Sequence, residues 1–109
     1  MQSKFHGACT IQHLPREMMA NLFKQYYYVY VLQSIKDGNK YTGYTKNLPS
    51  GFEAHQNGEV PSTRDRRPFK LIYFEGCLNQ QDATKREKYL KTHYGKMFLK
   101  NRLKSYFTG

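Results

Sequence analysis

The sequence predicts a small α/β sandwich whose elements follow one another in the order strand, strand, helix, strand, helix, helix. Two features carry this prediction: two aromatic and β-branched segments joined by an Asp-Gly turn, and two later helices that each begin at an asparagine cap. A chain of 109 residues is long enough for one domain with a core of its own, without disulfides or metals. We expect this domain to span residues 26–107, after a leader of residues 1–25 that is poorly ordered or loosely docked.

The hairpin at residues 26–45 organises the domain. We predict strands over 27–33 and 40–45, joined by a turn over 36–39 whose Asp-Gly pair supplies the positive φ angles of a tight turn. Six of the ten tyrosines of the chain lie within this hairpin. A buried tyrosine hydroxyl needs a hydrogen-bond partner, so two interpretations stay open. Either an aromatic strand pair covers a small core, or one or two hydroxyls point into a shared site.

The next elements are a helix, a loop and a third strand. Asn47 is a suitable cap for a helix that runs to about residue 57, and Gly51 in the middle of this helix costs about 1 kcal/mol relative to alanine. A loop over 59–68 leads to a strand over 69–75 with apolar residues on both faces. This pattern places the third strand inside the sheet, or beneath helices on at least one side.

Two helices are predicted in the last third of the chain. Asn79 caps the first of them, and one face of that helix carries Ala83, Glu87, Leu90 and Tyr94. The second follows Gly95, and its apolar stripe consists of Leu99, Leu103, Tyr106 and Phe107. The face of the first helix that we expect to be buried therefore includes an acidic residue.

Charge and composition restrict the partners of the chain. Eighteen Lys and Arg against eight Asp and Glu give a net charge of +10, which favours nucleic acid as the partner, DNA in particular, and an acidic membrane surface second. We expect no membrane partner, because the basic stretches lack the apolar stripe of a membrane-surface helix and no apolar run is long enough to cross a bilayer. Cys9 and Cys77 show neither metal-ligand spacing nor a disulfide framework, and no signal-peptide pattern is present. These features are typical of a cytoplasmic protein.

Glu87 stands out among the charged residues. From Lys85 onward it is the only acidic residue beside eight basic ones. A glutamate is seldom buried without a partner, because desolvation of its charge costs several kcal/mol. Either Glu87 pairs with Arg86 or Lys91, or its helical face is not buried, or it is a hard oxygen ligand for Mg²⁺ or Mn²⁺.

Two tyrosines and a histidine are further candidates. Tyr30 and Tyr41 lie on the two strands of the hairpin, so pairing can bring both hydroxyls to one side. A phenol has a pKa near 10, and it serves as a base only if a cation, a metal or a relay lowers that value. His55, one helical turn after Gly51, is a candidate relay, although a lone histidine is more often a surface or packed residue.

Taken together, these residues resemble the GIY-YIG nuclease domain. No single motif is specific, but the ordered set is. The set comprises Tyr28-Val29-Tyr30, Tyr41-Thr42-Gly43, Asn47-Leu48, His55, a Thr- and Arg-rich loop, residues 68–75, and Arg86-Glu87-Lys88. The resemblance covers residues 26–106, and more narrowly it is to the small single-domain bacterial members that are described as endonucleases.

The resemblance implies an α+β arrangement, a sheet of three antiparallel strands flanked by helices, which matches the order of elements above. It also implies metal-dependent hydrolysis of a phosphodiester bond, with one Mg²⁺ or Mn²⁺ ion that polarises the scissile phosphate. By position, Tyr30 and Tyr41 are the tyrosines of the two motifs, and Gly43 is the glycine that allows close backbone approach. Glu87 is the metal-binding carboxylate. His55 is the residue that assists proton transfer, so Tyr41, deprotonated or bridged through His55, would help to generate the attacking water.

One departure from the family pattern concerns catalysis. The family has an arginine ten residues after the second tyrosine and four before the histidine, and here that residue is Gly51. An arginine there holds the phosphate and neutralises developing charge, and loss of one such donor typically lowers the rate about 10²- to 10³-fold. Arg64 or Arg66 could reach in from the loop instead. The other departure, Tyr28-Val29 in place of Gly-Ile, is also expected among the small bacterial members.

Three hypotheses follow. The first is a metal-dependent endonuclease weakened by Gly51. The second is a non-catalytic DNA- or RNA-binding module that keeps the nuclease fold and contacts backbone charge. The third is a structural protein that binds an acidic partner. The basic surface that the first two require comprises Lys46, Arg64, Arg66, Arg67, Lys85, Lys88, Lys91, Lys96 and Lys100.

Overall fold

The computed structural model describes residues 15–109, and its central element is a three-stranded antiparallel sheet. Strand β1 (Tyr27–Ser34) lies in the middle, between β2 (Lys40–Thr45) and β3 (Phe69–Cys77), so the strand order is β2-β1-β3. The predicted α+β fold is confirmed, and the hairpin strands agree with the prediction to within one residue.

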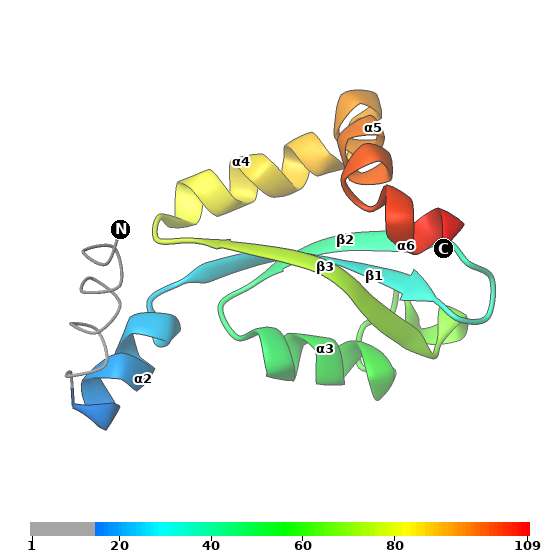
Figure 1. Cartoon of the computed structure of the whole chain (residues 1–109). Coiled ribbons are helices and arrows are strands. Elements are labelled where there is room, and N and C mark those ends of the chain that lie inside the picture. The colour runs from blue at the N-terminus through cyan, green and yellow to red at the C-terminus, as the bar shows by residue number, and fades with distance from the viewer. Residues whose placement is uncertain (1–14) are drawn as a thin grey trace.

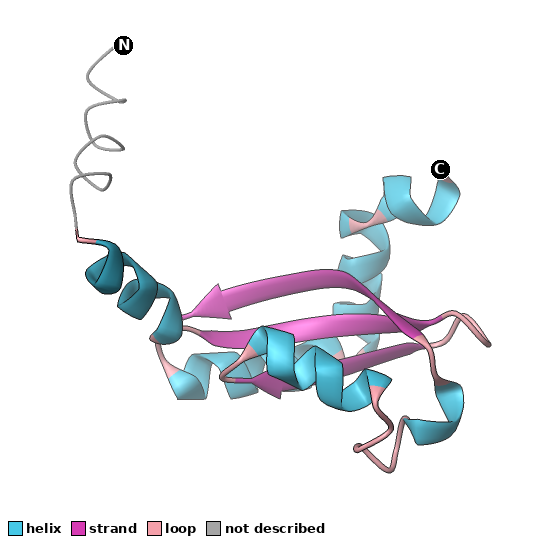
Figure 2. Cartoon of the chain, turned by 90° about the horizontal axis from the view of Figure 1, so that it is seen from below, coloured by secondary structure: helices cyan, strands magenta, loops and turns pink. Residues whose placement is uncertain are grey.

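Helices cover both faces of the sheet. In chain order, the helical segments of the described residues are α2 (Arg16–Lys24), α3 (Leu48–Gln56), the 3-10 helix η1 (Arg64–Arg66), α4 (Gln80–Leu90), α5 (His93–Arg102) and α6 (Lys104–Thr108). Figure 1 shows α4 to α6 on one side of the sheet and α3 on the other. In the view from below, α3 lies in front of the strands (Figure 2).

The two faces of the sheet have different cores, because alternate residues of β1 point to opposite faces. The face toward α4 and α5 holds an apolar buried cluster, which consists of Val29, Val31, Ala83, Leu90 and Leu99. The face toward α3 holds Tyr30, Leu32 and Phe69, with half-buried side chains of α3 packed against them. Among the buried residues of β1 in these two clusters, Tyr30 on the α3 face is therefore the one with a polar side-chain group.

The predicted starts of the first two helices are confirmed, whereas the third helix begins at His93 and contains Gly95 instead of following it. The Asn47 side chain accepts a hydrogen bond from the N–H of Ser50 at the start of α3. The Asn79 side chain accepts from the N–H groups of Gln81 and Asp82 at the start of α4. These short contacts satisfy backbone donors that have no partner inside the helix.

The structure departs from the prediction after Leu90, where α4 ends. Thr92 caps α5 by accepting a hydrogen bond from the N–H of Gly95, so Tyr94 belongs to α5. The prediction that Tyr94 extends the buried face of α4 is wrong, because its side chain is 71 % exposed. The turn between the helices is tight enough that a Cβ on Gly95 would collide with the carbonyl oxygen of Tyr89.

Two further expectations need correction. The last predicted helix is two helices, α5 and α6, and Tyr106 is exposed whereas Leu99 is buried. For strand β3 the sequence left two alternatives open. The strand lies at an edge of the sheet, so the placement inside the sheet is wrong, whereas the placement beneath helices is confirmed by its contacts with α3 and α4.

Part of the predicted leader forms a regular element. Helix α2 begins directly after Pro15, where a proline suits the entrance of a helix. The expectation for residues 1–14 lies outside the described residues. No helix within residues 15–109 is long and apolar enough to span a membrane.

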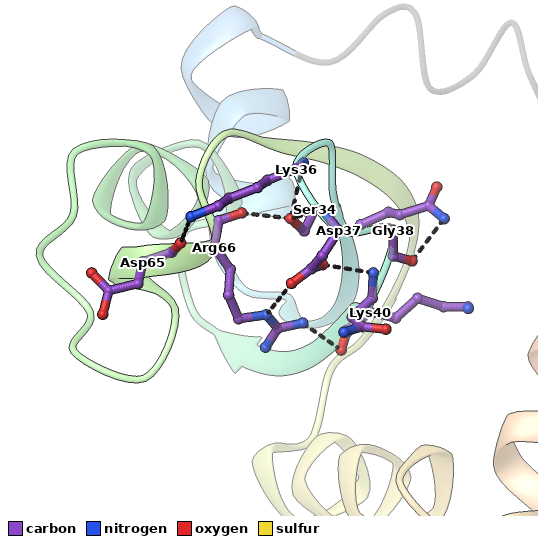
Figure 3. Close-up of polar contacts among 9 residues, drawn as sticks. Ser34, Lys36, Asp37, Gly38, Lys40, Asp65 and Arg66 are labelled. Atoms are coloured by element: carbon purple, nitrogen blue, oxygen red, sulfur yellow. Dashed lines mark hydrogen bonds and ion pairs between the residues drawn. The ribbon is translucent and has the colours of Figure 1, made fainter.

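The hairpin turn is held by polar contacts with η1 (Figure 3). Gly38 has a φ of 77°, as predicted, but Asp37 has no positive φ and instead accepts a hydrogen bond from the N–H of Asn39. The buried Ser34 hydroxyl accepts from two N–H groups of the turn and donates to the carbonyl oxygen of Arg66 at 2.6 Å. The turn is therefore anchored to the loop before β3.

Candidate functional site

A chain of buried polar side chains lies between the sheet and α3. The Tyr30 hydroxyl and His55 Nε2 are 2.8 Å apart, and His55 Nδ1 lies 2.8 Å from Thr63 Oγ1. The three residues are 4 %, 2 % and 0 % exposed. The Thr63 hydroxyl also lies 3.4 Å from the carbonyl oxygen of Val60, which can only accept.

The Val60 carbonyl oxygen determines which atom donates and which accepts in each of these hydrogen bonds. Thr63 donates to Val60, so its oxygen accepts from Nδ1–H of His55. The other ring nitrogen, Nε2, then accepts from the Tyr30 hydroxyl. In this arrangement each side-chain polar atom of Tyr30, His55 and Thr63 has a partner.

Burial favours the protonation states that this arrangement requires. Burial raises the pKa of Tyr30 to about 12, with further contributions from Tyr41 and from the negative charge of Glu87. Burial lowers the pKa of His55 below its ordinary value. Near neutral pH the phenol is therefore protonated and the imidazole is neutral, so Tyr30 is a hydrogen-bond donor.

Gly43 allows the Tyr30 phenol to lie across the edge strand. The two residues are paired between β1 and β2, and paired residues point to the same face. A Cβ on Gly43 would lie 2.5 Å from both Cζ and the hydroxyl of Tyr30, closer than van der Waals contact permits. The glycine is therefore required by a side chain that rests on its backbone.

Tyr41 lies beside this chain, and its hydroxyl makes no hydrogen bond with any residue of the described range 15–109. Its ring centroid is 4.9 Å from that of His55 and 6.5 Å from that of Tyr30. The expected bridge between Tyr41 and His55 is a ring contact, because Nε2 of His55 accepts from Tyr30 and Nδ1–H donates to Thr63. The hydroxyl of Tyr41 is the phenol that remains available to a substrate or a water.

Glu87 comes from α4, the helix on the opposite face of the sheet. Its Oε2 accepts a hydrogen bond from Lys91 Nζ at 2.9 Å, and its side chain is 22 % exposed. The ion pair that the sequence left open is thus formed with Lys91, whereas Arg86 pairs with Glu75. The charge of Glu87 still raises the pKa of Tyr30, so the two groups lie within electrostatic reach of each other.

Gly51 lies on α3 beside the end of β2. A Cβ at this position would lie 3.1 Å from Oγ1 and 3.3 Å from Cγ2 of Thr45. A side chain at residue 51 would therefore begin next to the edge strand that carries Tyr41, and Thr45 would have to shift slightly to admit it.

The loop arginines are held by carbonyl oxygens of the same chain. Arg64 Nε donates to Gly58, and Arg67 Nε donates to Arg64. Arg66 donates to the Lys40 carbonyl oxygen and lies 3.7 Å from the Asp37 carboxylate (Figure 3). None of these contacts brings Arg64 or Arg66 against Gly51.

The predicted lysines are all exposed, as a surface for a polyanion requires. They are Lys46, Lys85, Lys88, Lys91, Lys96 and Lys100. Thr63 is the residue that sequence reasoning missed. It lies in a loop without periodicity, and the only available signal was that a buried histidine needs a partner for each ring nitrogen.

Comparison with known proteins gives a family match over most of the chain. The family model of the GIY-YIG catalytic domain matches residues 26–102. The chain therefore belongs to the GIY-YIG family, whose fold is of the nuclease type.

Individual relatives are UPF0213 proteins, small members of this family. One from Clostridium perfringens is 48 % identical over 65 residues, which is 59 % of this chain and 69 % of the relative. Another from Staphylococcus saprophyticus is 39 % identical over 67 residues, or 61 % and 80 % of the two chains. A solution NMR structure of a UPF0213 protein from Bacillus halodurans is 32 % identical, with a TM-score of 0.43, and the match covers 68 % of this chain and 81 % of that one.

Proposed function

We propose that this protein is a divalent-metal-dependent endonuclease that hydrolyses phosphodiester bonds in nucleic acid, DNA above all, and that Gly51 weakens its activity. The observation that supports this proposal is the position of Tyr41 beside the hydrogen-bonded Tyr30–His55 pair, of which Tyr30 lies within electrostatic reach of Glu87. The net charge of +10 favours an anionic substrate.

The two tyrosines have different parts in this proposal. Tyr41 contacts the attacking water, because its hydroxyl has no partner among residues 15–109. Tyr30 is aligned for a relay: its oxygen takes a proton from the water as its own proton passes to Nε2 of His55. Thr63 accepts from Nδ1–H and holds the imidazole in the orientation that this transfer needs.

Glu87 fits a metal that binds one carboxylate. No group of three or more His, Cys, Asp or Glu side chains forms a metal site within the described part of the chain. Mg²⁺ keeps several waters and commonly binds one or two carboxylates together with substrate phosphate, so a lone, partly exposed glutamate suits it. When bound, the ion polarises the scissile phosphate and stabilises the leaving oxygen.

The Gly51→Arg variant tests the proposal. We expect it to cleave supercoiled plasmid and branched DNA about 10²- to 10³-fold faster than the parent in the presence of Mn²⁺, because it restores one preorganised donor. Because Thr45 crowds the new side chain, the Thr45→Ala/Gly51→Arg variant should be at least as active. Gly51→Ala is the matched control, since it adds the Cβ without the guanidinium group.

Glu87→Gln in the Gly51→Arg background should return cleavage to the level of the parent. Circular dichroism and thermal unfolding establish that each variant is folded. If folded Gly51→Arg and the double variant both stay at the level of Gly51→Ala, the endonuclease proposal is wrong.

The second candidate function is a non-catalytic nucleic-acid-binding module. Two observations favour it: glycine stands in place of the catalytic arginine, and the Glu87 carboxylate is paired with Lys91. A salt titration of DNA affinity in EDTA tests it, because neutralised phosphates make log K fall steeply with log salt. A slope near zero would contradict phosphate-driven binding.

A further inference from the structure

A cavity of about 740 Å³ opens on the α4 and α5 side of β2, across the edge strand from the Tyr41–His55 ring contact. Its strand wall is formed by residues 39–42, which include Tyr41, and its apolar walls are Leu90, Leu99 and Phe107. Leu90 and Leu99 are only 1 % and 4 % exposed, so the floor lies at the level of the core. The volume is in the range of sites that bind small molecules.

The mouth of the cavity is positively charged. Four lysines line it, and no acidic residue does: Lys40, Lys91, Lys96 and Lys100. Lys91 pairs with Glu87, and Lys40 Nζ lies 4.9 Å above the ring of Phe107. For the remaining two, Lys96 and Lys100, no acidic partner exists within residues 15–109. A ligand that fits this cavity therefore has an anionic part, which contacts the lysines, and a flat or compact apolar part, which contacts the apolar walls.

A nucleotide of a nucleic-acid strand has both parts. Its phosphates can contact ammonium groups, which act as point charges for phosphate. Its base can be buried against apolar side chains only if it leaves the base stack, because a paired base shows its edges and not its faces. Tyr41 is the residue that the cavity and the candidate site share, although its ring packs with Tyr30 and His55 on the α3 face and the cavity lies on the opposite face of β2.

We infer that this cavity binds an unpaired nucleotide of the substrate strand, with the base on the Leu90, Leu99 and Phe107 walls and the flanking phosphates at Lys96 and Lys100. The inference rests on the proposed nucleic-acid function and narrows the substrate to strands with unpaired nucleotides, such as single strands, bulges and flaps.

Binding in EDTA, without cleavage, tests the inference. The probes are two fluorescein-labelled duplexes of equal length, one fully paired and one with a single 2-aminopurine bulge. We expect the bulged duplex to bind at least five-fold more tightly than the paired one, and the 2-aminopurine fluorescence to change when its base leaves solvent. Lys96→Gln/Lys100→Gln and Phe107→Leu should each remove the preference and the fluorescence change.

The matched control for the loss of charge is Lys36→Gln/Lys104→Gln. Both residues are exposed and neither lines the cavity, so this variant should keep the preference and the fluorescence change. Adenosine monophosphate is the competitor that distinguishes a free nucleotide from a nucleotide of a strand. It should displace the bulged duplex only weakly, because it lacks the second flanking phosphate.

The outcomes separate the two proposals. Equal affinity for the bulged and the paired duplex, with affinity for both intact, overturns the cavity assignment alone. Tight displacement by adenosine monophosphate overturns it in favour of a free nucleotide. Absence of binding to either duplex overturns both the cavity assignment and the nucleic-acid function.

Discussion

The two faces of the central strand β1 show how one element serves two purposes. Toward α4 and α5 it contributes Val29 and Val31 to a buried apolar cluster. Toward α3 it contributes Tyr30, whose hydroxyl begins a buried chain of hydrogen bonds. A buried polar group is costly unless it is paired. The face toward α4 and α5 therefore contributes stability through apolar burial, whereas the face toward α3 gives up part of that stability to hold oriented polar groups.

The apolar face should show the largest loss of stability on truncation. Leu90→Ala removes a side chain that is 1 % exposed, and we expect the free energy of unfolding to fall by about 2–5 kcal/mol through lost burial and the cavity left behind. Urea denaturation measures the change. Leu78→Ala is the control, because Leu78 is 61 % exposed and its truncation should change stability by less than about 0.5 kcal/mol.

The Gly43 position should show the next largest effect. Gly43→Ala places a Cβ where the end of the Tyr30 ring lies, so the ring must move and its hydrogen bond to His55 is disturbed. We expect a loss of about 1–3 kcal/mol in unfolding free energy. A double-mutant cycle with Tyr30→Val should show that Gly43→Ala costs little once the ring is absent. Full additivity of the two changes would mean that they do not meet.

Removal of one hydroxyl should have opposite effects on the two faces. Tyr30→Phe leaves Nε2 of His55 buried without its donor, and we expect a loss of about 1–3 kcal/mol. Tyr44 points to the α4 face, where its buried hydroxyl has no partner among the described residues. Tyr44→Phe should therefore leave stability unchanged or raise it. Urea denaturation of both variants measures the difference, and equal losses would contradict the contrast between the faces.

The smallest effect is expected from pH. Because burial lowers the pKa of His55, the unfolded chain binds this proton more readily than the folded protein. The stability that neutral His55 contributes is present above pH 6.5, the ordinary value, and is lost as the pH falls below it. Unfolding free energy measured between pH 7.5 and 5 should decrease, and His55→Gln should flatten this decrease. An unchanged slope in the variant would assign the pH dependence to other groups.

Local features of the sequence predicted the elements well. Asn47 and Asn79 are caps because each accepts hydrogen bonds from N–H groups two or three residues away. The aromatic and β-branched residues of β1 and the Asp-Gly turn are likewise local signals, because each involves residues that are neighbours in the sequence. The expectation failed at Tyr94, where the period of α4 was extended through a helix end that the packing of Gly95 against Tyr89 imposes.

The candidate site was only partly accessible to the same reasoning. The ordered motifs named Tyr30, Tyr41, His55 and Glu87 as the residues of interest, and their roles stay predictions. The partners of these residues did not follow from their spacing, since Tyr30 and His55 are 25 residues apart and Thr63 lies in an irregular loop. The hydrogen-bond partners of these residues depend on which side chains come within hydrogen-bond distance once the sheet and α3 have packed together.

The sequence by itself determined the order of the strands, the helices that Asn47 and Asn79 cap, the basic charge and the glycine at residue 51, because each of these is a local or compositional property. Only the tertiary structure decided that His55 bonds to Tyr30, that Gly43 lies beneath a phenol ring, and that Glu87 pairs with Lys91. These contacts require two separately formed elements to meet at one edge of the sheet, or one side chain to choose among several charged neighbours. Packing of the whole domain, and not any local pattern, settles both.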